Sequence, residues 1–185
     1  MRVRLLDATV ATLAEKGYTR TTTTEIARRA RVSRGAQLHH FPTKAELVAG
    51  AVEHLFEQRH NEYLAAFARL PSGQNRAAAA VDLLWSVISG PTFYAWLEVV
   101  VAARTDARLR RTVTGIVRRF VDSVYTTFRR LFPGNESHGA VIPGFAFAVL
   151  QGLALDQMVV PDAPHIPQVL DRLKLLGHFV FPEAR

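Results

Sequence analysis

Residues 22–40 of this chain read TTTEIARRARVSRGAQLHH and contain two helix starts close together. Thr22 and Glu25 match a capping box, in which a threonine and a glutamate three residues later each satisfy a free backbone N–H group. Ser33 is a second N-cap candidate, because its hydroxyl can accept a bond from the turn that follows. The stretch therefore predicts two short helices joined by a tight turn. That is the layout of a helix-turn-helix, whose second helix lies in the major groove of DNA.

Helical patterns continue outward from this stretch in both directions. Apolar residues recur at helical spacing, and no segment alternates convincingly with a period of two. Thr43 and Glu46 form another capping box, at the start of a long fourth helix. The predicted fold class is all-α, with about nine helices, the eighth of which can begin as early as Pro143. The predicted helices span about residues 2–16, 23–29, 33–40, 43–70, 77–89, 92–103, 106–131, 145–159 and 166–181.

The chain is basic, with a formal net charge of +7, and the bias is sharpest from Arg20 to Phe41. Five arginines in that segment stand against a single acidic residue, Glu25. A basic cluster fits a polyanionic partner such as DNA, although an ordinary solvated surface can have the same composition. The chain contains no cysteine, which excludes disulfides and thiolate metal sites.

The sequence predicts no membrane span, secretion signal or catalytic centre. The longest apolar stretch, residues 145–160, is broken by polar residues and glycine, and the first residues lack a signal-peptide core. We therefore expect a cytoplasmic protein. His39 and His40 point to different helix faces without a carboxylate at ligand spacing, so we predict no metal site. Nucleophile motifs and glycine-rich phosphate loops are absent from the sequence, so we predict neither an enzyme nor a cofactor.

Several short motifs occur in a fixed order near the start of the chain. They are Leu5-Leu6-Asp7-Ala8, Ala14-Glu15-Lys16-Gly17-Tyr18, Thr22, Glu25-Ile26-Ala27, Ala30, Val32-Ser33-Arg34-Gly35-Ala36, His39-His40-Phe41-Pro42, Lys44 and Glu46-Leu47. Over about residues 4–48, this order resembles the TetR family of bacterial regulators. In such proteins a variable C-terminal domain binds a small molecule, and the last two helices form a four-helix dimer interface. Ligand binding changes the separation of the paired DNA-reading heads, and the protein leaves its operator.

The resemblance implies a domain organisation and a function. Residues 1–48 would form the helix-turn-helix DNA-binding domain, and residues 49–185 the C-terminal effector-binding and dimerisation domain, connected by the helix at about 43–70. The implied function is a homodimeric transcriptional regulator, most simply a repressor released from a palindromic operator by a small hydrophobic or aromatic ligand. The alternative is a constitutive or architectural DNA-binding regulator without an effector. A more distant alternative is an enzyme whose helix-turn-helix is vestigial.

By position, the resemblance assigns DNA contacts to the helix starts and to the second helix of the motif. Arg34 is the expected base reader, because arginine can bridge O6 and N7 of guanine. Gly35 would let the backbone approach DNA closely, and Ala36 would touch a thymine methyl group. Contacts to phosphate or to a groove edge are expected from Thr22, Thr23, Thr24, Ser33, His39, His40 and Lys44.

Three further DNA-binding candidates depart from the family pattern. Arg31 stands where the turn usually has glycine, and a positive φ there would cost roughly 1 kcal/mol, which a phosphate contact would offset. Leu38 stands where a tyrosine would contact phosphate. Gln37 occupies a position where the domain normally buries an aliphatic residue. We expect Gln37 either to be partly exposed and to read adenine, or to mark a slight rotation of the helix.

The remainder of the chain offers candidates for a ligand pocket and for a dimer interface. Pockets for hydrophobic ligands are mostly apolar with a few polar groups. The pocket candidates are Trp85, Phe93, Trp96, Glu98, Phe120, Gln151 and Asp156. Small and apolar residues at helix-packing spacing are the dimer candidates, namely Val149, Gly152, Leu153, Leu170, Leu173 and Leu176. For both sets the alternative is ordinary core packing within one chain.

Overall fold

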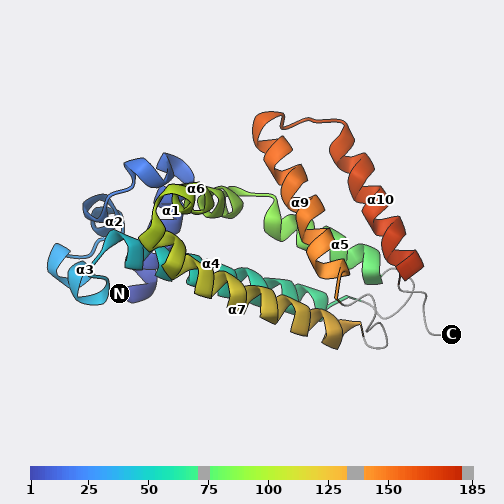
Figure 1. The fold of residues 1–185 in the computed structure, drawn as a ribbon, viewed down its shortest axis with the longest axis horizontal. Helices are drawn as coiled ribbons and strands as arrows, with labels where there is room; N and C mark the ends of the chain where they lie inside the picture. Colours follow the sequence, from blue (N-terminus) through green and yellow to red (C-terminus); the bar gives the residue numbers. More distant parts are fainter. Residues whose placement is uncertain (71–75, 133–139, 181–185) are drawn as a thin grey trace. The chain divides into compact units, whose positions relative to one another are not determined.

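The computed structural model describes residues 1–70, 76–132 and 140–180, and these ranges contain nine helices and no strand (Figure 1). The predicted all-α fold class is confirmed. The first four helices are α1 (Arg2–Arg20), α2 (Thr23–Arg29), α3 (Arg34–His40) and α4 (Lys44–Phe67). The others are α5 (Arg76–Ile88), α6 (Pro91–Thr105), α7 (Ala107–Leu131), α9 (Ile142–Val159) and α10 (His165–Val180).

A break interrupts α1 at Gly17, whose φ of 73° and ψ of 169° are not helical. Glycine is favoured at positive φ because it has no Cβ to meet the neighbouring carbonyl oxygen. One further turn follows the glycine, and Thr21 N donates to Tyr18 O at 3.2 Å to end it. The prediction that the first regular helix stops before Gly17 is therefore confirmed, and the added turn reaches Arg20.

The chain folds into two compact units, residues 1–58 with 91–120 and residues 59–90 with 121–185. The first unit contains the predicted helix-turn-helix. α4 and α7 each begin in the first unit and end in the second. The functional division that the sequence suggests at residue 48 stays a prediction, because packing alone does not assign functions to parts of a chain.

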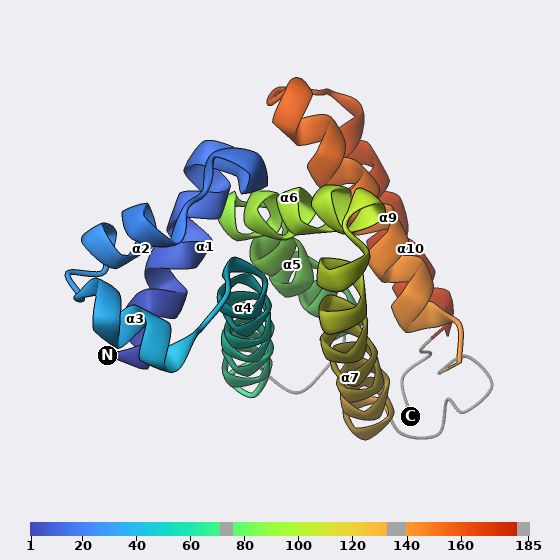
Figure 2. The same cartoon turned by 60° about the vertical axis from the view of Figure 1, so that its left-hand side comes forward.

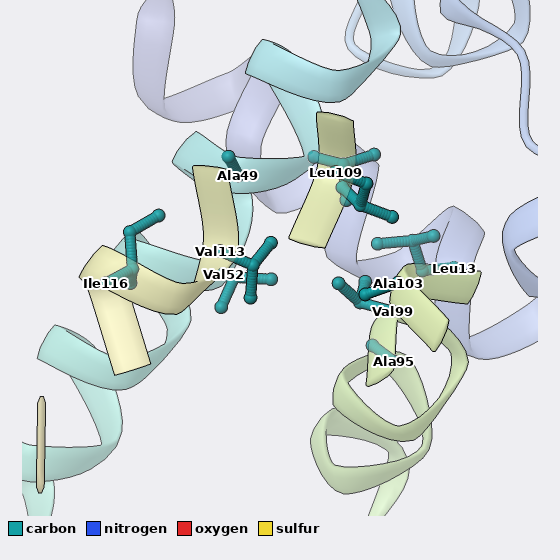
Figure 3. Close-up of a cluster of buried hydrophobic side chains, with 10 residues drawn as sticks. Leu13, Ala49, Val52, Ala95, Val99, Ala103, Leu109, Val113 and Ile116 are labelled. Carbon is teal, nitrogen blue, oxygen red and sulfur yellow. The ribbon is translucent and has the colours of Figure 1, made fainter. Parts of the chain in front are cut away.

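One apolar cluster joins four helices of the first unit. Leu13 of α1, Val52 of α4, Val99 of α6 and Val113 of α7 are among its buried members (Figure 3). On α7 the inward positions recur at the spacing of a helical face, which leaves the arginines of that helix on the outside. This cluster fixes the register of α6 against α1.

A second apolar cluster holds the helix-turn-helix itself. Leu6 of α1, Ile26 of α2, Phe41 after α3 and Leu47 of α4 are all buried in it. Gly50 of α4 lies against this cluster, because a Cβ there would stand 2.9 Å from Cε1 of Phe41. This close packing holds α4 against Phe41, the residue that follows α3.

In the second unit, α5 packs against both α9 and α10, which lie side by side (Figure 2). Leu153 of α9 and Leu170 and Leu173 of α10 are buried within this chain. Lys174 Nζ lies 2.7 Å from Asp82 Oδ1 and adds an ion pair between α10 and α5. These three leucines face the core of their own chain, and their assignment to a dimer interface stays a prediction.

Candidate nucleic-acid interface

All three helix starts predicted around the motif are capped by hydroxyl groups. Thr22 Oγ1 accepts a hydrogen bond from Glu25 N, and Ser33 Oγ accepts one from Ala36 N, each at 3.2 Å. Thr43 Oγ1 accepts from Glu46 N at the same distance. The caps fix where α2, α3 and α4 begin and so confirm the helix-turn-helix read from the sequence.

The Glu25 carboxylate forms ion pairs, whereas a full capping box would use it to accept a bond from a backbone N–H group. Its Oε1 atom accepts from Lys16 Nζ and from Arg28 Nη2, each at 2.9 Å, and its Oε2 atom accepts from Arg28 Nε at 3.0 Å. These cations, Arg28 first, lower the pKa of Glu25 to about 2. The result is a bridge from α2 to α1 that also neutralises part of the basic cluster.

The turn between α2 and α3 contains a residue in the left-handed region of backbone conformation. The sequence suggested this, because Arg31 stands where the family usually has glycine. Arg31 has a φ of 53°, the one positive φ outside glycine in the part of the chain that the structure describes. Arg4 of α1 supports this turn, because its Nε and Nη2 atoms donate to Ala30 O at 3.0 and 2.5 Å. Nη2 also donates to Arg31 O at 2.7 Å. The sequence did not predict this role of Arg4. The only indication was that Arg4 is a basic residue on the face of α1 that packs against the helix-turn-helix.

Five of the thirteen predicted DNA-contacting residues are exposed on α3. Arg34, Gly35, Leu38, His39 and His40 are exposed, and Ser33 is exposed just before the helix. No heavy atom lies within 4 Å of the place where a Cβ at Gly35 would stand. Ala36 is half-buried. Arg34 and Leu38 lie one turn apart on one side of α3, and Arg34 stands at its N-terminus.

Gln37 is fully buried, which excludes the expectation that it is partly exposed and reads adenine. Its Nε2 atom donates to Phe41 O at 2.6 Å, and its Oε1 atom accepts from Arg34 Nη1. Arg34 Nη1 also donates to Thr23 Oγ1. The amide is tolerated in the core because both of its polar ends find partners there. Gln37 is therefore a support for Arg34 rather than a base reader.

Lys44 stands at the first residue of α4 and is half-buried. Its Nζ atom donates to Tyr18 O at 2.6 Å and lies 4.0 Å from the centroid of the Tyr18 ring. Burial lowers the pKa of Lys44. An ammonium group has three donors, so one bond to Tyr18 O leaves others for a phosphate oxygen.

The predicted ligand-binding residues fall into both compact units. In the first unit, Phe93 is buried, and Phe56 packs on both Trp96 and Phe120 with ring centroids 5.0 and 4.4 Å away. In the second unit, Trp85 and Gln151 are half-buried on α5 and α9, and they stay candidates.

Two acidic members of the ligand set are not directed into the interior. Glu98 is exposed, and its Oε2 atom accepts from Tyr18 N at 2.8 Å. Asp156 is exposed, and its Oδ2 atom lies 3.0 Å from His165 Nε2. Both carboxylates therefore make contacts at the surface of their own units, and their place in a ligand pocket stays a prediction.

The predicted dimer residues also divide once their burial is known. Gly152 and Leu176 are exposed and Val149 is half-buried, so these three remain available to a partner. Leu153, Leu170 and Leu173 face the core of their own chain, so a role for them at a dimer interface stays an untested prediction.

These features define a helix-turn-helix transcriptional regulator, and comparisons with known proteins agree. Residues 5–51 match the family model described as bacterial regulatory proteins, tetR family. An uncharacterised HTH-type transcriptional regulator of Mycobacterium tuberculosis is 30% identical over 163 residues, covering 86% of this chain and 83% of that protein. The HTH-type transcriptional regulator BetI of Brucella anthropi is 28% identical over 166 residues, covering 89% and 84%. The chain belongs to the TetR family of bacterial regulatory proteins.

Solved structures share this fold over nearly the whole chain. A transcriptional regulator from Rhodococcus is 25% identical with a TM-score of 0.72, covering 98% of this chain and 95% of that chain. A transcriptional regulator from Saccharomonospora viridis in complex with choline has a TM-score of 0.69 at 18% identity, covering 92% and 93%. The multidrug binding protein EbrR in complex with imidazole has a TM-score of 0.67 at 18% identity, covering 100% and 96%.

Proposed function

We propose that this protein is a homodimeric repressor that binds a palindromic operator through α3 and leaves it when a small hydrophobic or aromatic molecule binds. The observation that carries the proposal is α3 itself, a capped helix that begins with an exposed arginine. Membership of a family of bacterial regulators supports the DNA-binding part. Proteins of the same fold in complex with choline and imidazole support the ligand-binding part. We place the regulator in the cytoplasm, where it would meet its DNA.

The proposed DNA-binding surface has a base reader at its centre and phosphate contacts around it. Arg34 reads guanine from the first turn of α3, and the open space at Gly35 admits the edge of the groove. The hydroxyl groups that precede α2 and α3 lie where backbone N–H groups attract phosphate. The phosphate contacts are assigned to Thr22, Thr23, Thr24, Arg31, Ser33, His39, His40 and Lys44.

The proposed dimer interface uses the exposed face of α9. Phe145, Gly152, Leu155 and Val159 lie on one helical face, with Phe145 46% and Val159 82% exposed. On α10, Leu176 is 48% exposed. Among the described residues, α9 is the one helix long and apolar enough to cross a membrane. Pairing with the same face of a second chain removes this apolar surface from water without a membrane.

The candidate effector-binding residues are mainly aromatic, because the two acidic candidates, Glu98 and Asp156, are exposed and bound at the surface of their own units. Phe93, Trp96 and Phe120 are the aromatic candidates of the first unit, and Trp85 and Gln151 are the candidates of the second unit. Such a lining suits a small apolar molecule whose orientation is set by very few hydrogen bonds.

Selection of bound sequences from a random DNA library tests the DNA-reading part. We expect a palindrome whose half-site centres lie about 34–36 Å, or a multiple of that distance, apart. Arg34→Ala should relax the sequence preference and cost about 1–3 kcal/mol. Arg118→Ala is the matched control, because Arg118 is exposed and makes no ion pair within the described residues. Failure of the chain to enrich any sequence, or unchanged selectivity in Arg34→Ala, would refute the proposal.

Sedimentation and thermal-shift measurements test the other two parts. Leu155→Glu should yield monomers, whereas Val101→Glu, which changes an exposed valine of α6 in the first unit, should leave the dimer intact. An effector at 100 times its dissociation constant should stabilise the protein by about 2.7 kcal/mol and release the operator. If no apolar compound in a broad screen stabilises the protein or releases the operator, the alternative of a constitutive DNA-binding regulator without an effector is favoured.

A further inference from the structure

The break in α1 is held by a side chain that comes from α6. Tyr18 N, the first amide after the break, donates to Glu98 Oε2 at 2.8 Å. The residue at position 17 is tightly constrained, because its φ is positive and a Cβ there would stand 2.7 Å from the same oxygen. Glycine is therefore favoured at position 17 by the backbone conformation, and a Cβ there would displace the flexible end of the Glu98 side chain.

The other polar end of Tyr18 is bound to the start of α4. Tyr18 O accepts from Lys44 Nζ at 2.6 Å, and the same ammonium group lies 4.0 Å from the centroid of the Tyr18 ring. One residue thus links Glu98 through its amide to Lys44 through its carbonyl group and its ring. All of these residues lie in the first compact unit.

The apolar packing beneath this link ties Glu98 to the body of the unit. The next residue on α6, Val99, is fully buried and packs in the cluster that contains Leu13 of α1. A displacement of α6 along α1 therefore moves Glu98 relative to Tyr18. The bond between Tyr18 N and Glu98 therefore depends on the position of α6 against α1.

We propose that Glu98 is a positioning residue for DNA binding, because its carboxylate fixes the turn at Tyr18 and Tyr18 in turn holds the Lys44 ammonium group at the start of α4. Loss of the Glu98 contact frees Tyr18, lets the Lys44 side chain move away and removes one phosphate contact from the operator complex. The proposal rests on the proposed function at one point, the contact between Lys44 and phosphate.

Simple charge arguments give the opposite expectation for a Glu98 variant. Removing a carboxylate from a DNA-binding protein should strengthen its binding, because the net positive charge increases. If Glu98 positions Lys44 through Tyr18, Glu98→Ala should weaken DNA binding instead. Glu57→Ala is the matched control, because Glu57 is an exposed glutamate of the same unit without an ion pair among the described residues.

Operator affinity measured by fluorescence anisotropy over a range of salt concentrations tests the proposal. We expect Lys44→Ala to weaken binding about tenfold and to reduce the salt slope by about one. Glu98→Ala should reproduce both changes, and the double variant should be no weaker than Lys44→Ala alone. Glu98→Gln should restore most of the affinity, because its amide oxygen can still accept from Tyr18 N. Tighter binding by both Glu98→Ala and Glu57→Ala would overturn the proposal.

A measurement without DNA separates failure of this proposal from failure of the proposed function. NMR of the full chain should show faster exchange of the Tyr18 amide and a more mobile Lys44 ammonium group in Glu98→Ala than in the wild type. If Lys44 stays as ordered as in the wild type, the positioning role of Glu98 is refuted. If the wild-type chain binds no DNA sequence selectively, the proposed function fails, and the NMR comparison still decides whether Glu98 holds Lys44.

Discussion

Replacing Arg4 with methionine should loosen the turn of the helix-turn-helix. In the wild type, the Arg4 guanidinium group donates to the carbonyl oxygens of Ala30 and Arg31, at the end of α2. Methionine keeps an unbranched apolar stem but has no donor, so these carbonyl groups lose their bonds to the charged group. The same oxygens lie at a helix C-terminus, where a positive charge is favoured by the helix dipole.

The size of the effect follows from the kind of bond and from its exposure. A hydrogen bond to a charged group contributes about 1.5–3 kcal/mol when it is well shielded from water. Arg4 is exposed, so we take about 1.5 kcal/mol for the whole contact rather than for each bond. With an m value of about 2 kcal/mol per molar urea, the unfolding midpoint should fall by about 0.75 M.

Urea unfolding and amide hydrogen exchange measure this prediction together. The amide of Val32 donates to Ala27 O at 3.0 Å across the turn, and its exchange should accelerate about tenfold in Arg4→Met. Arg118→Met is the control, because it removes an exposed arginine that makes no ion pair in the described part of the chain. If the two variants unfold at the same urea concentration and Val32 exchanges at the wild-type rate, the role of Arg4 is disproved.

Three further predictions concern pH and packing. Because the pKa of Glu25 falls from 4.5 to about 2 on folding, its ion pairs stabilise the protein above pH 4.5 and that stability is lost toward pH 2; urea titrations of Glu25→Gln should lack this loss. Burial raises the pKa of Tyr63 from 10 to about 12, so stability should fall between these pH values, and Tyr63→Phe should remove that component in alkaline unfolding curves. Gly50→Ala should cost about 1–3 kcal/mol in thermal unfolding because its Cβ meets the Phe41 ring, whereas Gly35→Ala, with open space around it, should not destabilise the head.

Local signals predicted the helix-turn-helix well, because its determinants are close together in the sequence. A capping hydroxyl acts within its own turn, so Thr22, Ser33 and Thr43 could be assigned from spacing alone. Gly17 ended the regular part of α1 for the same reason. At the eighth predicted helix, α9 begins at Ile142 because the proline that follows needs no N–H bond in the first turn.

Local sequence patterns could not predict contacts between distant parts of the chain. The bond between Tyr18 N and Glu98 could not be predicted, because the sequence does not show that a backbone amide 80 positions away needs an acceptor. Leu153 and Leu170 have the spacing of a helix interface whether the neighbouring helix belongs to the same chain or to a partner. Whether Gln37 is buried or exposed could not be predicted either, because its burial depends on the acceptor at Phe41 O and the donor at Arg34 Nη1.

The contacts of Arg34 have a consequence for the entropy of DNA recognition. A free arginine side chain carries about 2 kcal/mol of rotamer entropy, which is normally lost when it binds a base. In this protein the guanidinium group is already held by Thr23 and Gln37 before DNA arrives. Part of that ordering therefore takes place during folding, and the proposed base reader loses less freedom on meeting guanine. Calorimetry of operator binding should show a less unfavourable entropy in the wild type than in a variant whose residue 37 cannot hold Arg34.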